Sequence, residues 1–159
     1  MNTARIVLVG ALLASSYALY AKPAAKPTSP SAQELVAARQ AGMDMSAASL
    51  TLLKNASNNG VPLKNLAFPA SGMAKWAVAV PALFAESTKG AKSDAKAEVW
   101  SDRAGFNAKA QAYIDATKAM SAAVAADDKV AFDAALASTG AACKGCHDAY
   151  KVPPPAKPG

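Results

Sequence analysis

The chain has 159 residues and a formal net charge of +6, and it contains two cysteines and a single histidine. One histidine leaves no second imidazole for acid–base catalysis, and we find no nucleophile constellation, so an enzyme is not expected. Removing the first 21 residues, whose only charged side chain is Arg5, lowers the charge to +5, and several lysines lie in the flanking ends. The folded part is therefore closer to neutral, and no nucleic-acid partner is indicated.

The first 21 residues have the pattern of an export signal. Arg5 supplies the positive start, Ile6 to Ala14 form an apolar run, and small residues offer cleavage after Ala18 or Ala21. The run is shorter than the roughly 20 apolar residues that a membrane-spanning helix needs, and an uncleaved N-terminal anchor is the alternative. We therefore expect residues 1–21 to be a signal peptide and the mature protein to be periplasmic.

Two proline-rich segments flank the part of the chain that can fold. Residues 22–30 are rich in proline, lysine and alanine, which is typical of a flexible linker, and residues 152–159 form a similar tail. We expect both ends to be disordered or extended. About 140 residues follow the signal, enough for one domain with its own core, and we place that domain at residues 31–151.

This domain should be all-α, because its alanine, leucine, lysine and aspartate recur at helical spacing and no convincing period-two run is present. A first helix is predicted to begin at Ser31, since Ser31 and Glu34 form a capping box. It should run to about Ser57, where the stretch Asn58-Asn59-Gly60 ends it.

Three more helices are predicted downstream. A second helix fits about Gly72 to Ala85, and Pro81 is expected to kink it or end it early. After a long connection, a third helix should run from about Asp102 to Ala126, and a fourth should begin at the Asp127-Asp128 cap. Both carry an inward stripe at alternating steps of about four and three: Phe106, Ala110, Tyr113, Thr117, Met120 and Val124, then Phe132, Leu136, Thr139, Cys143, Cys146 and Tyr150. The pattern predicts an antiparallel four-helix bundle with a cofactor held between facing helices.

Every cysteine and the only histidine lie in the five residues Cys143-Lys144-Gly145-Cys146-His147. The spacing Cys-x-x-Cys-His is that of covalent haem attachment, in which the two thiols bond the haem vinyl groups and the histidine ligates iron. We therefore predict one haem c, bound through Cys143 and Cys146, with His147 as the proximal axial ligand. An export signal supports this prediction, because haem is attached to such proteins outside the cytoplasm.

Three other interpretations of the cluster each lack a part that they require. A structural zinc site needs four ligands, and the chain has no second pair of cysteines or histidines to complete one. A thioredoxin-like dithiol would lie beside a strand in a βαβ unit, and no strand pattern is near. A plain disulfide would leave His147 unexplained. Haem attachment is the interpretation that uses all three side chains.

The residues carry a family resemblance. The runs Glu98 to Phe106 and Ala142 to Lys151, the Arg39-x-x-x-Met43 pattern and the stretch Pro81 to Phe84 resemble the cytochrome c′ and cytochrome c-556 family. The resemblance extends over about residues 31–151. It implies a periplasmic four-helix bundle with one covalently attached c-type haem near the C-terminus, and a homodimer formed through the first two helices. The short, proline-interrupted second helix of this chain departs from that pattern and puts the dimer in doubt.

Met43 and Met45 compete for the sixth coordination position of the iron. At about 100° per residue, the two point roughly 200° apart on the first helix, so only one can face the haem. Met43 shares its face with Leu35, Val36, Leu50 and Leu53 and is predicted to point inward. The family pattern also places a distal haem neighbour there, so Met43 is our candidate distal ligand. Ordinary core packing is the alternative.

Two functions follow from the two possible roles of Met43. A thioether that ligates iron gives a low-spin one-electron carrier, as in cytochrome c-556, and this was the leading prediction. A thioether that only covers the haem leaves an open high-spin iron that can bind nitric oxide or carbon monoxide, as in cytochrome c′. With two ionised haem propionates, the charge of +5 falls to about +3, which favours an acidic periplasmic or membrane-bound redox partner.

Further residues could contact the haem or its ligands. Arg39, on the face of Met43, could pair with a haem propionate, and an exposed, solvated arginine is the equally weighted alternative. Lys151 could lie near the proximal imidazole or simply act as a cation at a helix C-terminus. Tyr113 and Phe106 could line the haem pocket, although a helix seam needs aromatic residues in any case.

Overall fold

The computed structural model describes residues 29–155. The predicted signal peptide, residues 22–28 of the linker and the last four residues of the tail lie outside the described residues. Residues 152–155 are an exposed segment without regular structure. The boundaries proposed for the signal, linker and tail therefore stay predictions.

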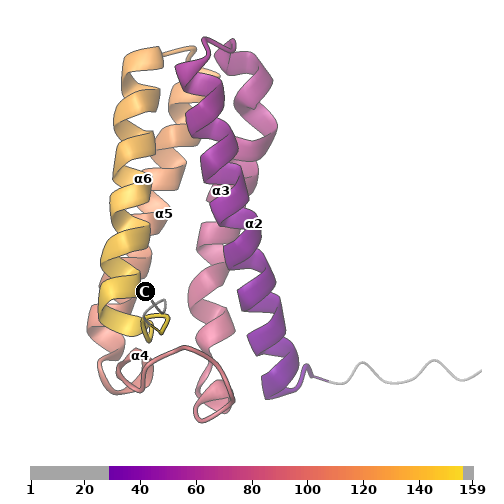
Figure 1. The fold of residues 1–159 in the computed structure, drawn as a ribbon, viewed down its shortest axis with the longest axis vertical. Helices are drawn as coiled ribbons and strands as arrows, with labels where there is room; N and C mark the ends of the chain where they lie inside the picture. The colour runs from indigo at the N-terminus through magenta and orange to yellow at the C-terminus, as the bar shows by residue number, and fades with distance from the viewer. Residues whose placement is uncertain (1–28, 156–159) are drawn as a thin grey trace, which may run out of the picture.

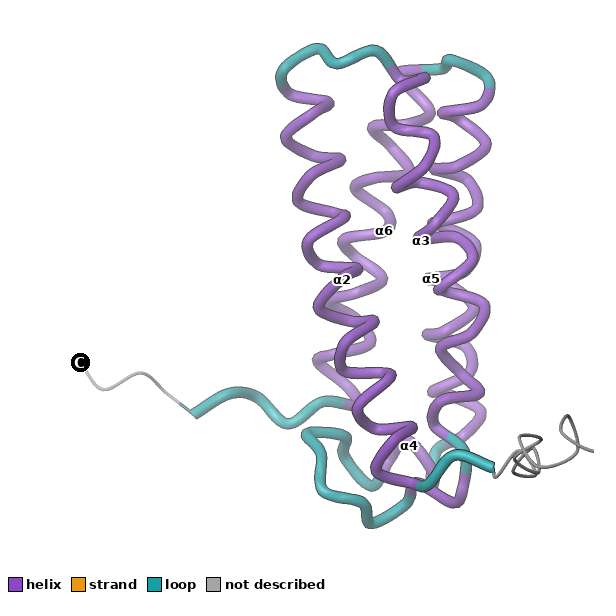
Figure 2. The backbone as a smooth tube through the Cα atoms, turned by 90° about the vertical axis from the view of Figure 1, so that its right-hand side faces the viewer, coloured by secondary structure: helices purple, strands orange, loops and turns teal. Residues whose placement is uncertain are grey.

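Four long helices make an antiparallel bundle, as the sequence predicted (Figure 1). They are α2 (Ala32–Asn58), α3 (Ala67–Ala79), α5 (Arg103–Ala125) and α6 (Lys129–Tyr150). A short helix, α4 (Glu98–Ser101), lies in the long connection between α3 and α5. Figure 2 shows that this connection and the carboxyl end of α6 lie at the same end of the bundle.

Helix α2 begins and ends where its local sequence predicted. The Ser31 hydroxyl accepts a hydrogen bond from the Glu34 amide at 3.2 Å, and the Ser31 amide donates to the Glu34 carboxylate at 2.7 Å. This reciprocal capping box satisfies two amides that have no partner within the helix. At the other end Gly60 adopts a φ of 69°, the left-handed conformation that glycine tolerates best.

The second helix was predicted to start too late. It begins at Ala67, directly after a 3₁₀ turn at Leu63–Leu66, rather than at Gly72. Pro69 does not prevent this, because it lies in the first turn, where backbone amides lack an acceptor within the helix. Pro81 acts as expected: the α-helix ends at Ala79, and the chain continues as a 3₁₀ turn at Val80–Phe84.

The segment Leu63–Phe84 reaches a mean hydropathy of 1.2 over 18 residues, enough by length and composition to cross a membrane. Its Ala70, Met73 and Ala77 are buried in the bundle core, however. We therefore interpret it as a helix of the bundle.

The predicted inward stripes of α5 and α6 are confirmed. All six residues predicted for α5 are buried, and in α6 Phe132, Thr139 and Tyr150 are buried while Cys143 and Cys146 are half-buried. Asp102 caps α5 by accepting from the Gly105 amide at 3.1 Å, and Asp128 caps α6 by accepting from the Ala131 amide at 2.9 Å. The caps satisfy amides in the first turns of both helices, and the buried stripes place the cysteines on the inward side of α6.

Candidate functional site

A cavity of about 610 Å³ lies between α2, α5, α6 and the connection that precedes α4. All five predicted site residues line it: Arg39, Met43, Cys143, Cys146 and His147. They come from two helices that are separated by about a hundred residues in the chain. The bundle therefore brings the C-terminal motif opposite the first helix, as a haem between facing helices would require.

The cysteines and the histidine occupy little more than one turn of α6. Both thiols are free and half-buried, and burial raises the pKa of each. Burial lowers the pKa of the His147 imidazole, and the positive charge of Lys151 lowers it further, against the opposing effect of Asp148. His147 lines the cavity as an exposed residue, and its lowered pKa favours the neutral imidazole, whose nitrogen lone pair can bind a metal.

Met43 and Met45 differ in the way the helical geometry predicted. Met43 is half-buried, lines the cavity and packs against the main hydrophobic core. Met45 is 70% exposed on the opposite face of α2. Met43 is thus the methionine that faces the cavity, and ligation of iron by its sulfur stays a prediction.

Arg39 is only 3% exposed, so the solvated alternative is wrong. Its guanidinium donates hydrogen bonds to the Leu83 carbonyl oxygen at 3.2 Å, Thr88 Oγ1 at 3.1 Å and Ser93 Oγ at 2.9 Å. It also lies 4.4 Å from the ring centroid of Phe84. These acceptors are neutral, and no carboxylate of residues 29–155 lies within ion-pair distance. A buried guanidinium of this kind has capacity for an anion, and a haem propionate would supply one.

Aromatic side chains close the cavity near the end of α6. The Phe106 ring lies 5.0 Å from that of Phe84 and 5.5 Å from that of Tyr150, in tilted and edge-on arrangements. The Tyr150 hydroxyl donates to Asp102 at 2.7 Å, and this bond raises the pKa of Tyr150 to about 12. This aromatic cluster therefore joins α5, α6 and the end of the α3 segment.

Tyr113 lines the cavity higher up α5. Its hydroxyl is buried and has no hydrogen-bond partner within the described part of the chain. A buried polar atom without a partner is costly, and an occupant of the cavity could provide that partner. The sequence had marked Tyr113 and Phe106 as pocket candidates, and both line the cavity.

Other lining residues were not anticipated. Lys109 of α5 and the loop residues Ser93, Asp94 and Ala95 reach the cavity. Lys109 follows Phe106 by three positions, so the helical period could have indicated it. The loop residues carry no periodic pattern, and no local signal identifies them.

The cavity fits a haem. Its volume lies within the range of about 300–1,000 Å³ that small-molecule and cofactor sites occupy. Two thiols and a neutral imidazole project from one helix turn, which matches covalent attachment and axial ligation. Apolar and aromatic side chains surround them, and a buried cation and an unpartnered phenol remain for polar contacts.

Comparison with known proteins decides the family. A family profile described as Cytochrome C′ matches residues 34–151. The chain belongs to the cytochrome c′ family. Its cofactor is therefore covalently attached haem c.

Two curated relatives are cytochromes c′ of about equal similarity. The protein of Pararhodospirillum photometricum is 45% identical over 73 residues, which are 45% of this chain and 58% of the relative. That of Alcaligenes xylosoxydans xylosoxydans is 46% identical over 70 residues, or 44% of this chain and 54% of the relative. The matched segment therefore spans little more than half the length of these curated relatives.

Solved structures of the family share the whole bundle. A cytochrome c prime from Alcaligenes xylosoxidans, a ferrous variant with bound NO, superposes with a TM-score of 0.72 at 29% identity. The match covers 80% of this chain and all of that one. The cytochrome c′ of Rubrivivax gelatinosus gives a TM-score of 0.71 at 29% identity over 78% of this chain and 99% of that one. These likenesses confirm the four-helix architecture.

Proposed function

We propose that this cytochrome c′ family member is a periplasmic haem protein that binds nitric oxide or carbon monoxide at an open iron. The observation that carries the proposal is the packing of Met43, whose side chain is held against the hydrophobic core while it lines the cavity. Related structures support it, because several are nitric oxide complexes of a cytochrome c prime. The export-signal pattern of residues 1–21 supports the periplasmic location.

Each site residue has a distinct role in this proposal. Cys143 and Cys146 would hold the cofactor through thioether bonds, and His147 would ligate its iron. The haem supplies an iron with a coordination position that a diatomic gas can occupy. Met43 covers the distal side and excludes water from it, and Arg39 stabilises a propionate in a buried setting.

A one-electron carrier is the second candidate. It is favoured by the position of Met43 at the cavity wall, since a flexible thioether that reaches the iron would make it six-coordinate and low-spin. The sequence alone favoured this function. The core packing of Met43 and the nitric oxide complexes of relatives shift the preference to gas binding. An acidic redox partner belongs to the carrier proposal.

Replacing Met43 with alanine separates the two functions. If Met43 only covers the haem, we expect the Met43→Ala protein to stay high-spin and to bind carbon monoxide about three- to tenfold more tightly, because about 1 kcal/mol of steric hindrance is removed. The optical spectra of the ferrous protein during a carbon monoxide titration measure this. Met45→Ala, on the exposed face, is the matched control and should leave the titration unchanged. A change from low-spin to high-spin in Met43→Ala would favour the electron carrier.

We also propose a homodimer through the outer face of α2. Five exposed residues follow alternating steps of three and four along that face: Ala38, Ala41, Met45, Ala48 and Leu52. Such a stripe is a helix-packing seam, and its alanines permit close approach of a second helix. Although α3 is short, as the sequence suggested, this seam lies wholly on α2.

Charges placed in this seam should make the protein monomeric. We expect the double variant Met45→Lys/Leu52→Lys to sediment as a monomer, because like charges would face each other across a two-fold axis. Analytical ultracentrifugation at micromolar concentration tests it against the unmodified protein. Val130→Lys, at an 81% exposed position of α6, provides the control. A wild-type protein that is already monomeric would refute the dimer.

A further inference from the structure

At the carboxyl end of α6, Lys96 donates hydrogen bonds to three of the last four carbonyl oxygens of the helix. The last four carbonyl groups of an α-helix lack amide partners within it. In α6, the Lys96 ammonium donates to the carbonyl oxygens of Asp148 at 3.0 Å and Ala149 at 3.3 Å. The Lys96 amide donates to the Tyr150 carbonyl oxygen at 2.9 Å. Only the carbonyl of His147 has another donor, the amide of Lys151 at 3.0 Å.

Lys96 belongs to a loop that also holds the distal helix. We call residues 85–97 the bridging loop. Its Thr88 and Ser93 hydroxyls accept hydrogen bonds from the buried Arg39 of α2. Its Asp94 carbonyl oxygen accepts from the Val152 amide at 2.8 Å, just beyond α6. The loop therefore contacts both helices that carry candidate iron ligands.

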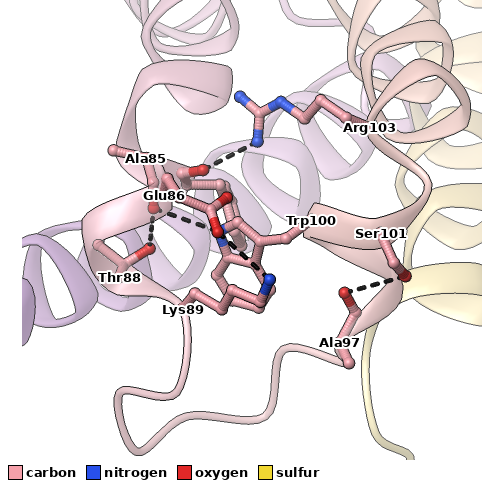
Figure 3. Close-up of polar contacts among 9 residues, drawn as sticks. Ala85, Glu86, Thr88, Lys89, Ala97, Trp100, Ser101 and Arg103 are labelled. Carbon is pink, nitrogen blue, oxygen red and sulfur yellow. Dashed lines mark hydrogen bonds and ion pairs between the residues drawn. The ribbon is translucent and has the colours of Figure 1, made fainter.

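The start of the bridging loop is held by a hydrogen bond within the loop and by donors from α4 and α5 (Figure 3). The Ala85 carbonyl oxygen accepts from the Thr88 hydroxyl at 2.8 Å and from the Trp100 indole at 3.2 Å. Arg103 donates to the Phe84 carbonyl oxygen at 2.8 Å, next to the first loop residue. Closer to Lys96, the Ser93 hydroxyl accepts from Arg39 at 2.9 Å and from the Ala95 amide at 3.4 Å, so the loop is also held just before Lys96.

We propose that Lys96 is a positioning residue for His147, which it fixes by capping the carboxyl end of α6. The proposal rests on the function proposed above, in which His147 is the proximal ligand. A cation at a helix C-terminus stabilises it by about 0.3–1 kcal/mol through the helix dipole. Here three carbonyl oxygens within three residues of His147 are tied to one side chain and its backbone amide. The same ammonium donates to the carbonyl oxygen of Asp148, the residue after His147, and we expect its charge to favour the ferrous over the ferric state.

Lys144, which lies on α6 itself, offers a matched comparison with Lys96. Lys144 is exposed on α6 and forms an ion pair with Asp148, so its charge is compensated and it caps no carbonyl. Lys96 has no carboxylate within ion-pair distance among residues 29–155. Removing either charge changes the net charge equally. Only removal of Lys96 should affect the end of α6.

The test uses the haem-loaded protein with Lys96→Met, Lys96→Arg and Lys144→Met. In Lys96→Met we expect amide hydrogen exchange at residues 147–152 to accelerate about fivefold, from the loss of about 1 kcal/mol of capping. We expect the equilibrium constant for reduction to fall about threefold, which is about 30 mV for one electron. Lys96→Arg should keep both the exchange rates and the reduction equilibrium of the wild type. Lys144→Met should leave the exchange rates unchanged.

Two results would overturn the proposal. Unchanged exchange in Lys96→Met would show that the lysine does not hold the helix end, even if the potential falls. An equal acceleration in Lys144→Met would show an effect of surface charge alone. The wild-type spectrum reports separately on the proposed function: a haem that lacks histidine ligation would remove the role of His147, whatever the exchange data give.

Discussion

A Cys143→Ser/Cys146→Ser variant is expected to contain no covalently bound haem. Serine hydroxyls do not form thioethers with vinyl groups, and these two residues are the only cysteines of the chain. Both thiols face the cavity from one side of α6, so no other side chain can replace them. We expect a loss of at least a hundredfold in haem that survives denaturation.

Haem staining after denaturing electrophoresis, with absorption of the pyridine complex, measures this loss. Lys144→Gln is the control. Lys144 lies between the two cysteines and its side chain is exposed, so this variant should retain full haem content. Single cysteine variants should keep a fraction of the haem through one bond. Undiminished covalent haem in the double variant would contradict the assignment of the site.

Phe106→Ala is expected to lower the free energy of unfolding by about 3–5 kcal/mol, the usual cost of deleting a buried aromatic ring. Phe106 is 1% exposed and contacts the rings of both Phe84 and Tyr150. The Arg103 guanidinium also lies 5.1 Å from its centroid. Alanine would leave a cavity in the cluster that joins α5, α6 and the end of the α3 segment.

Urea unfolding of the haem-loaded protein, followed by circular dichroism, measures this change. Phe68→Ala is the matched control, because Phe68 is 88% exposed in the first turn of α3 and should change stability by less than about 0.5 kcal/mol. Equal losses in the two variants would show that the aromatic cluster does not stabilise the fold as described. A loss of less than about 1 kcal/mol in Phe106→Ala would also show that the aromatic cluster does not stabilise the fold as described.

The bundle could be predicted from the sequence because its signals are local. Caps at Ser31 and Asp128 and the stripes of α5 and α6 depend on spacing within one helix, and all are confirmed. The predicted start of α3 at Gly72 is wrong, because the helix begins at Ala67 and Pro69 lies within its first turn, where a proline fits. Local sequence does not distinguish a proline before a helix from one inside its first turn.

The site was only partly predictable. The thiols, the imidazole and the inward direction of Met43 follow from a motif and from helical geometry. The partners of Arg39 lie 44 to 54 residues away in the chain, so only the tertiary structure could show that it is buried. The contacts of Lys96 with α6 are equally remote and have no motif. The packing of Trp76 against Gly42 is a further contact between remote residues that has no motif. A Cβ atom added at Gly42 would come within 2.1 Å of the Trp76 ring.

The optical absorption spectrum of the purified ferric and ferrous protein, before and after carbon monoxide, tests the central claim most directly. Our account predicts a high-spin spectrum in both oxidation states and a clear shift when the gas is added to the ferrous protein. A low-spin spectrum with a sulfur-to-iron charge-transfer band and no reaction with carbon monoxide would contradict it. That result would make Met43 an iron ligand and the protein a one-electron carrier.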